Sequence, residues 1–275
     1  MFNGSGSLNN LLNINIDELK EIQLQILKHT ASFCDAHDIQ YWIDNGTLLG
    51  AVRHKGYIPW DDDIDVGMLR DDYEKMIRLF NEENDRYFFA CYETKKDFNL
   101  PHGKVFDTDT VLYEPDENGF RMCVNIDIFV YDNAPDDPEA LKHQFDRRDF
   151  YRRMYDYQHY NNFANVSVIK KSLAKMLVFL LKVFPQDYFI KKMIENCKKH
   201  NDEDSAEVGN FSSFSRQHCN KRVFSRFVEL EFEGMFFKAP AGYDEWLRSF
   251  YSDYMQLPPE EKRVSHHSFV AYRVL

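Results

Sequence analysis

The sequence predicts an α/β (α+β) fold, in which a mixed sheet with flanking helices is followed by a helix-rich C-terminal half. Three observations predict it. Apolar residues recur at helical spacing in residues 17–37, they alternate with polar residues in 63–68, and helical patterns dominate after residue 136. We expect residues 1–133 to form the core that carries the sheet. Residues 134–275 should form a helix-rich region with a β-hairpin, packed on that core as one unit.

The first half of the chain alternates helices with short strands. Leu19, Ile22 and Ile26 fall on one face of the first helix, as a buried face requires. Gly46 ends the first strand, and Thr47 is expected to cap the short helix that follows. In order, we expect a helix at 17–37, a strand at 39–43, a helix at 47–53, a strand at 63–68 and a helix at 71–81.

The rest of the chain passes from strands to helices. A hairpin should turn at Glu233-Gly234, and an irregular tail should begin at Pro258-Pro259. Pro185 should break the long helical stretch, because proline removes a backbone donor. We expect strands at 88–92, 104–106, 111–113 and 124–130, helices at 138–160 and 167–199, the hairpin at 227–237 and a helix at 243–251.

Composition narrows the classes of function. The 275 residues carry a formal net charge of −11, so nucleic acid is a poor first candidate for a partner. The polar stretch 1–10 does not resemble a signal peptide, and the longest apolar run, residues 176–181, is too short to span a membrane. Five scattered cysteines without a C-x-x-C pattern indicate reduced thiols, so we expect a cytoplasmic protein.

The segment most suggestive of chemistry is acidic. Four of the five residues 61–65 are aspartates, and neighbouring carboxylates repel one another unless a cation lies between them. Strand alternation places Asp63 and Asp65 on one face and Ile64 and Val66 on the other, in the core. Two carboxylates on a rigid strand offer the oxygen ligands that Mg²⁺ or Mn²⁺ prefers.

Two plainer interpretations compete with a metal site. An EF-hand calcium loop needs glycine at its sixth position and glutamate at its twelfth, where this segment has Val66 and Asp72. That interpretation is therefore rejected. A solvated acidic turn does not explain the apolar residues between the acids, so the metal site is favoured.

Asp127 is a candidate for a third metal ligand. It lies between Ile126 and Ile128 in a strand that otherwise reads as buried, and a buried acid needs a partner. A salt bridge to a lysine or arginine is the alternative. Beside Asp63 and Asp65, a shared two-metal site is the better interpretation.

The motifs resemble the LicD family. They are YWIDNGTLLGAVRH at residues 41–54 and IPWDDDID at 58–65, followed by shorter matches between residues 232 and 267. Members of the LicD family are phosphorylcholine transferases of bacterial surface glycans such as lipopolysaccharide and teichoic acid, and they are related to the fukutin group of ribitol-phosphate transferases. The family usually has Tyr-Gly-Asp where this chain has Ser252, and we attribute that glycine to a backbone turn.

The resemblance implies a nucleotidyltransferase-like catalytic core in residues 1–133. Gly46 and Thr47 match the family's glycine-hydroxyl pair, and the three acids Asp63, Asp65 and Asp127 match its metal ligands. Backbone N–H groups at Gly46-Thr47 would suit a phosphate.

The implied reaction moves a phospho-alcohol group from a CDP-linked donor to a glycan or lipid-linked glycan hydroxyl, with phosphocholine from CDP-choline favoured. Asp63 and Asp65 would hold one or two Mg²⁺ ions on the donor pyrophosphate. Asp127 would help to bind the catalytic metal and accept the proton of the acceptor. Displacement at phosphorus needs charge neutralisation and positioning above all.

Basic and aromatic residues near the motif are candidates for contacts with the donor. Arg53, His54 and Lys55 form a basic cluster one loop before the acids, suited to phosphate; cations stabilising a helix C-terminus are an equal alternative. An aromatic cage around choline could draw on Trp42, Tyr57 and Trp60, although each is more easily explained as core.

Residues 170–199 form a basic amphipathic stretch, with lysines on one face and apolar residues on the other. Peripheral contact with the inner face of a membrane is one interpretation, and a core helix with a solvated lysine face is the favoured one. Two rival functions remain open: transfer of a nucleotidyl group to a small acceptor, and non-catalytic glycan binding on an inactivated fold.

Overall fold

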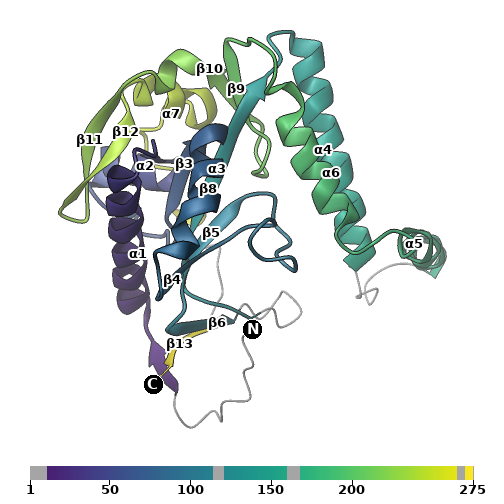
Figure 1. Ribbon diagram of the computed structural model, residues 1–275, viewed down its shortest axis with the longest axis horizontal. Coiled ribbons are helices and arrows are strands. Elements are labelled where there is room, and N and C mark those ends of the chain that lie inside the picture. Colours follow the sequence, from purple (N-terminus) through teal and green to yellow (C-terminus); the bar gives the residue numbers. More distant parts are fainter. Residues whose placement is uncertain (1–10, 114–120, 160–167, 265–269, 275) are drawn as a thin grey trace.

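The computed structural model describes residues 11–113, 121–159, 168–264 and 270–274. Figure 1 shows a sheet flanked by helices, with a helical arm that extends from one edge. The predicted mixed α/β architecture is confirmed. Among the described residues, no helix is both long enough and apolar enough to cross a membrane.

The largest sheet is built around β8. This strand (Asn125–Ala134) pairs in parallel with β3 (Asp65–Leu69), which in turn pairs with the short β2 (Trp42–Ile43). On its other side, β8 pairs with two antiparallel strands, with β5 (Gly103–Asp107) along its first half and with β9 (Glu207–Asn210) at its end. The outer strands are β4 (Tyr87–Ala90) on β5 and β10 (Gln217–Asn220) on β9. Strands from both sides of residue 133 thus build one sheet.

A second, four-stranded sheet joins segments that are distant in the sequence. Its order is β1 (Leu11–Ile14), β13 (Val270–Val274), β6 (Thr110–Tyr113) and β7 (Arg121–Met122). The prediction of an irregular tail is therefore wrong at residues 270–274, which form a strand. Its neighbours β1 and β6 lie elsewhere in the chain, so local sequence carried no sign of the pairing.

The described helices follow the predicted order, with shifted ends. The helix α1 begins after Asn15, whose side chain accepts a hydrogen bond from the N–H of Glu18. The proline break is confirmed, because separate helices lie on either side of Pro185. The helices are α1 (Ile16–Ala36), α2 (Asn45–His54), α3 (Arg70–Leu79), α4 (Pro138–His159), α5 (Val168–Leu181), α6 (Tyr188–Cys197) and α7 (Tyr243–Tyr251).

The predicted hairpin is confirmed as β11 (Phe227–Phe232) and β12 (Met235–Pro240). Its turn residues, Glu233 and Gly234, both have positive φ angles, of 51° and 72°. A two-residue hairpin turn of type I′ requires this conformation at both central positions.

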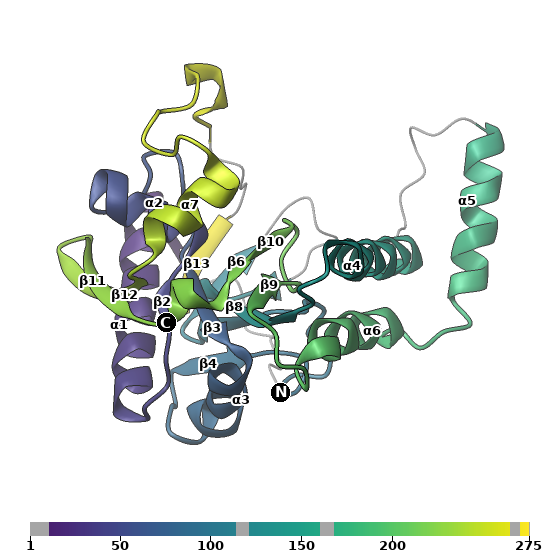
Figure 2. The ribbon, with the colours of Figure 1, turned by 90° about the horizontal axis from the view of Figure 1, so that it is seen from above.

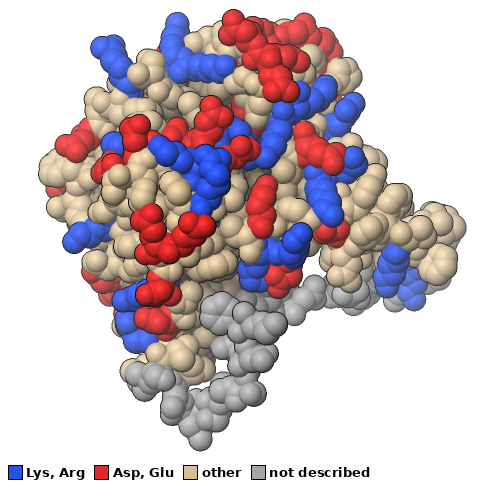
Figure 3. Space-filling view, in the orientation of Figure 1, with Lys and Arg blue, Asp and Glu red and all other residues tan. Residues whose placement is uncertain are grey.

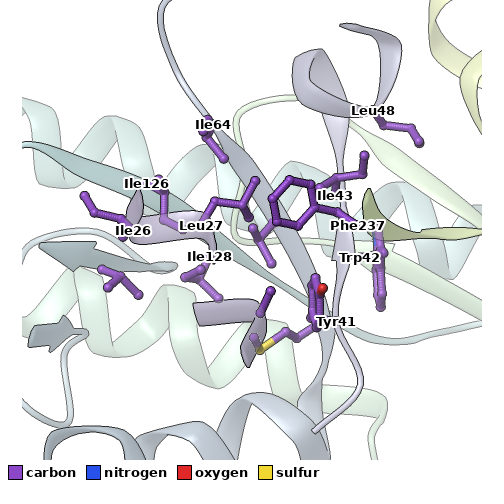
Figure 4. Packing of buried hydrophobic residues seen from close by; sticks show 14 of the residues in the cluster. Ile26, Leu27, Tyr41, Trp42, Ile43, Leu48, Ile64, Ile126, Ile128 and Phe237 are labelled. Atoms are coloured by element: carbon purple, nitrogen blue, oxygen red, sulfur yellow. The ribbon is translucent and has the colours of Figure 1, made fainter. Parts of the chain in front are cut away.

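The main core lies between α1, the large sheet and the hairpin. Ile64, Val66 and Ile128 are fully buried, and Ile126 is 1% exposed. Figure 4 shows Ile64, Ile126 and Ile128 near Ile26 and Leu27 of α1. The alternation predicted around the acids is therefore confirmed, because their apolar neighbours fill the core.

Helices α4 and α6 pack together into an arm that leaves the sheet beside β9, and α5 lies across its far end (Figures 1 and 2). The arm has a small apolar cluster of its own at its base, including Phe145, Cys197 and Phe211. The main core and the arm are thus packed separately.

Candidate active site

The site lies where three strands run side by side. Asp65 on β3 is the register partner of Asp127 on β8, and Asp127 is the register partner of Lys104 on β5. Side chains of register partners leave a sheet on the same face. Asp65, Asp127 and Lys104 therefore form one row across the sheet, and Asp63 lies two residues before Asp65 at the start of β3.

Asp65 is buried among other acids. The residue is 8% exposed, and burial raises the pKa of its carboxyl group well above the usual range of an aspartate. The nearby charges of Asp63 and Asp127 raise that pKa further, followed by those of Asp44 and Asp61. Repulsion of this kind is relieved either by a proton or by a cation.

Asp127 is held by two basic side chains. His102 Nε2 and Lys104 Nζ lie 3.1 Å and 2.7 Å from its Oδ1 atom. Burial acts to raise the pKa of Asp127, but the charge of Lys104 and the hydrogen bond from His102 outweigh it and hold that pKa below the usual range. The salt bridge considered as the alternative for Asp127 is therefore present, and it occupies Oδ1.

The donor set is compatible with a divalent cation. Charge and burial fit, because Asp65 is a desolvated carboxyl crowded by acids and Asp127 stays ionised. Oδ2 of Asp127 has no hydrogen-bond partner among the described residues, while Oδ1 is fixed by groups that would act as an outer shell. Among the same residues, no three acidic, histidine or cysteine side chains already converge as a metal cluster.

Thr47 does not cap its helix as predicted. The N-cap position belongs to Asp44, and Thr47 lies within the first turn of α2. Its Oγ1 atom instead accepts a hydrogen bond from the backbone N–H of Asp65, at 2.8 Å. Gly46 and Thr47 remain in the first helical turn, whose N–H groups have no acceptors within the helix. A β-carbon at Gly46 would lie 2.7 Å from Asp61 Oδ2, so this turn approaches the acidic loop closely.

Asp44 is a buried residue that the sequence analysis did not single out, although it lies inside the quoted motif. It is fully buried and accepts hydrogen bonds from Tyr131 Oη at 2.5 Å and from Trp246 Nε1 at 3.0 Å. Its backbone N–H donates to the carbonyl of Asp65. Asp44 therefore ties the start of α2 to both the acidic strand and α7.

The residues of the basic cluster, Arg53, His54 and Lys55, do not all contact the same part of the molecule. Arg53 donates to His54 Nε2 at 2.9 Å and to the carbonyl of Tyr254 at 2.8 Å. Lys55 Nζ lies 3.0 Å from Glu231 of the hairpin, and its side chain is 72% exposed. All three close the C-terminal end of α2, so both a structural role and a phosphate role remain open to Arg53 and His54.

The three aromatic candidates for a choline cage differ in burial. Trp42 is fully buried and stacks on Phe224 at a ring distance of 4.3 Å, so it belongs to the core and cannot surround a ligand. Tyr57 is half-buried and donates to the carbonyl of Lys20. Trp60 is half-buried, with the guanidinium of Arg263 5.8 Å from its ring.

Tyr251 on α7 is a functional candidate that sequence reasoning missed. The residue is 38% exposed, and the partial burial of its hydroxyl together with the charges of Asp65 and Asp61 raises its pKa. The quoted motif YSDYM contained Tyr251, but nothing in the sequence related α7 to the acidic strand. The histidines quoted at 266–267 lie outside the described residues.

The row of acids lies on the parallel strands β3 and β8 of a mixed α/β sheet, and two comparisons with known proteins give the class, which is that of a transferase. The family described as LicD/FKTN/FKRP, nucleotidyltransferase domain, matches residues 38–169. The lipopolysaccharide cholinephosphotransferase LicD of Haemophilus influenzae is 32% identical over 271 residues, which cover 94% of this chain and 98% of that protein. The chain belongs to the LicD family.

More distant relatives match in shorter segments. The human ribitol 5-phosphate transferase FKRP is 42% identical over 53 residues, covering 18% of this chain and 11% of that protein. An uncharacterised protein of Rickettsia prowazekii is 52% identical over 69 residues, covering 25% of this chain and 26% of its own length.

Proposed function

We propose that the chain is a divalent-metal-dependent transferase of a phospho-alcohol group, with phosphocholine favoured. The donor is a CDP-linked alcohol, and the acceptor is a hydroxyl of a cell-surface glycan such as lipopolysaccharide, or of its lipid-linked precursor. The observation that carries the proposal is the register pair Asp65–Asp127, with Asp63 beside it, in a chain similar over nearly its whole length to a lipopolysaccharide cholinephosphotransferase.

Each acid has a distinct role in the proposal. Asp63 and Asp65 would hold Mg²⁺ or Mn²⁺, and Asp127 would contribute its Oδ2 atom. A bound cation would neutralise charge on the donor pyrophosphate. Because Lys104 and His102 keep Asp127 ionised, it is better suited to bind a metal than to accept a proton from the acceptor.

The remaining residues position the donor. The acceptor oxygen forms a bond to the phosphorus that carries the alcohol, the bond from that phosphorus to the bridging oxygen breaks, and CMP leaves with that oxygen. The proton of the acceptor hydroxyl passes to solvent water. N–H groups of the first turn of α2, at Gly46 and Thr47, lie beside the acids and suit a phosphate oxygen. Arg53 and His54 are assigned to the departing phosphates, and Trp60 and Tyr251 to the quaternary ammonium group.

The test is a CMP-release assay with CDP-choline, CDP-ribitol and CDP-glycerol in parallel, in the presence of a glycan acceptor and Mg²⁺ or Mn²⁺. We expect release from one donor, lost with EDTA and in Asp65→Asn. The matched control is Asp71→Asn, because Asp71 is an exposed acid on α3. Pyrophosphate release from CTP would replace the proposal with nucleotidyl transfer. Absence of donor binding by calorimetry would replace it with a non-catalytic glycan-binding role.

A further inference from the structure

Among the described residues, helix α5 contacts the rest of the molecule mainly through α4. It packs on α4, where Val178 and Leu181 are buried. The Gln158 amide of α4 donates to the carbonyls of Leu181 and Phe184, which fixes the end of α5. Figures 1 and 2 agree that α5 lies at the far end of the arm, away from the sheet.

The opposite side of α5 is apolar and exposed. At 100° per residue, Met176, Phe179 and Leu180 fall on the side of α5 opposite Val178 and Leu181, and the same spacing continued into the turn after α5 adds Val183. Phe179 is 74% exposed and Val183 is 80% exposed, and Met176 and Leu180 are each more than half exposed. We call these four residues the α5 face. Contiguous exposed apolar groups of this kind mark a surface that is covered in use.

The charged residues of α5 itself are all of one sign. Lys175 and Lys182 are exposed and lie at one flank of the face, and the sequence of α5 contains lysines but no acidic residue. The chain as a whole carries a net charge of −11. In Figure 3 the end of the arm shows blue side chains amid tan. A basic flank on an acidic protein directs this end of the arm toward an anionic surface.

We propose that the α5 face binds the surface of an anionic lipid bilayer, with the apolar side chains inserted and the lysines at the headgroups. The 14 residues of α5 are too few to span a bilayer, so the helix lies in the interfacial plane. Apolar residues on one face beside lysines are the composition of interfacial helices. The proposal does not rest on the reaction that the site catalyses.

The test is flotation of the full-length protein with vesicles of phosphatidylcholine alone or with about one-third phosphatidylglycerol. We expect binding to the anionic vesicles at low salt, and at least about tenfold weaker binding to the neutral ones. The double variant Phe179→Glu/Val183→Glu should lose binding to both, because both side chains are exposed and charge opposes insertion. Lys175→Glu/Lys182→Glu should lose only the preference for anionic lipid.

Phe236→Glu is the matched control, because Phe236 is 64% exposed on the hairpin, and its binding should equal that of the unmodified chain. The alternative is that a second copy of the chain covers the α5 face. Light scattering after gel filtration tests this by measuring whether the protein is a monomer or a dimer. The proposal is overturned if the unmodified chain does not float with anionic vesicles at low salt. It is also overturned if Phe179→Glu/Val183→Glu binds as well as Phe236→Glu, or if that double variant instead converts a dimer to a monomer.

Discussion

Thr47 Oγ1 accepts a hydrogen bond from the backbone N–H of Asp65, at 2.8 Å, although 18 residues separate them. Thr47 is 2% exposed, so this bond is shielded from water. It fixes the first residue of β3 against the first turn of α2. The proposed phosphate-binding turn and the proposed metal ligand therefore hold each other in place.

Replacing Thr47 by valine should lower both transfer and stability, whereas serine should preserve both. Thr47→Val keeps the shape of the side chain but leaves the N–H of Asp65 unpaired, which costs about 1–3 kcal/mol. We expect activity to fall by at least about tenfold, since small displacements of positioned ligands are costly. Thr47→Ser keeps the hydroxyl and should retain most activity. Equal activity of the valine and serine variants would remove the hydrogen bond from the mechanism.

Asp65→Asn should stabilise the metal-free protein at neutral pH while abolishing transfer. A carboxyl group whose pKa is raised on folding adds stability below its ordinary pKa, near 3.9, and that stability is lost as pH rises through the raised value. The melting temperature of Asp65→Asn should therefore match that of the unmodified chain near pH 4 and exceed it at pH 7.

The unmodified chain and Asp65→Asn together also test whether Asp65 binds a metal ion. Mg²⁺ or Mn²⁺ should raise the melting temperature of the unmodified chain at pH 7 and leave that of Asp65→Asn almost unchanged, because binding to the native state alone stabilises it. Asp71→Asn should respond to the metal as the unmodified chain does. A metal response in Asp65→Asn as large as in Asp71→Asn would contradict the assignment of Asp65 as a ligand.

Removing the charge of Lys104 should destabilise the fold through Asp127. Both side chains are largely buried, at 13% and 16% exposed, and the loss of one partner of a buried pair costs about 3 kcal/mol. Lys104→Met should thus unfold at a clearly lower urea concentration, whereas Lys104→Arg keeps the charge and should lose less. If urea unfolded the methionine and arginine variants at the same concentration, the ion pair would carry no stability.

Ser252→Gly should make the protein more stable. Ser252 follows α7 with φ 55° and ψ −117°, a conformation that favours glycine strongly over residues with a β-carbon. This backbone conformation agrees with our expectation that a turn at Ser252 favours glycine. We expect a gain of about 1 kcal/mol, read as a rise in melting temperature of a few degrees. As a control, glycine at the exposed Ser249 position inside α7 should lower stability, because glycine is a poor helix residue.

Much of the site followed from local pattern. The alternation of Asp63 and Asp65 with Ile64 and Val66 was enough to place the acids on one face and the apolar residues in the core. The pairing of Asp65 with Asp127 was also anticipated, because a lone acid between two isoleucines required a polar partner. The roles of these acids in catalysis stay predictions until activity is measured.

The parts that sequence did not reveal depend on contacts between distant segments. Lys104 fell within a predicted strand, but its register opposite Asp127 is fixed by how β5 docks on β8. Asp44 accepts its hydrogen bond from Trp246, and Tyr251 comes under the charges of Asp65 and Asp61, only once α7 has packed against α2. The prediction that Thr47 caps α2 rested on the general preference for hydroxyl residues at helix starts, but the helix begins two residues earlier and the Thr47 hydroxyl accepts from the N–H of Asp65.

The strand β13 lies between β1 and β6, and those two strands do not pair with each other. During synthesis, the edges of β1 and β6 that pair with β13 stay unpaired until residues 270–274 have emerged from the ribosome. Closure of the small sheet is thus a late event that joins the two most distant parts of the described chain, and such long-range contacts slow folding. An arrested or truncated chain lacking residues 270–274 would present two open strand edges, which are sites of aggregation.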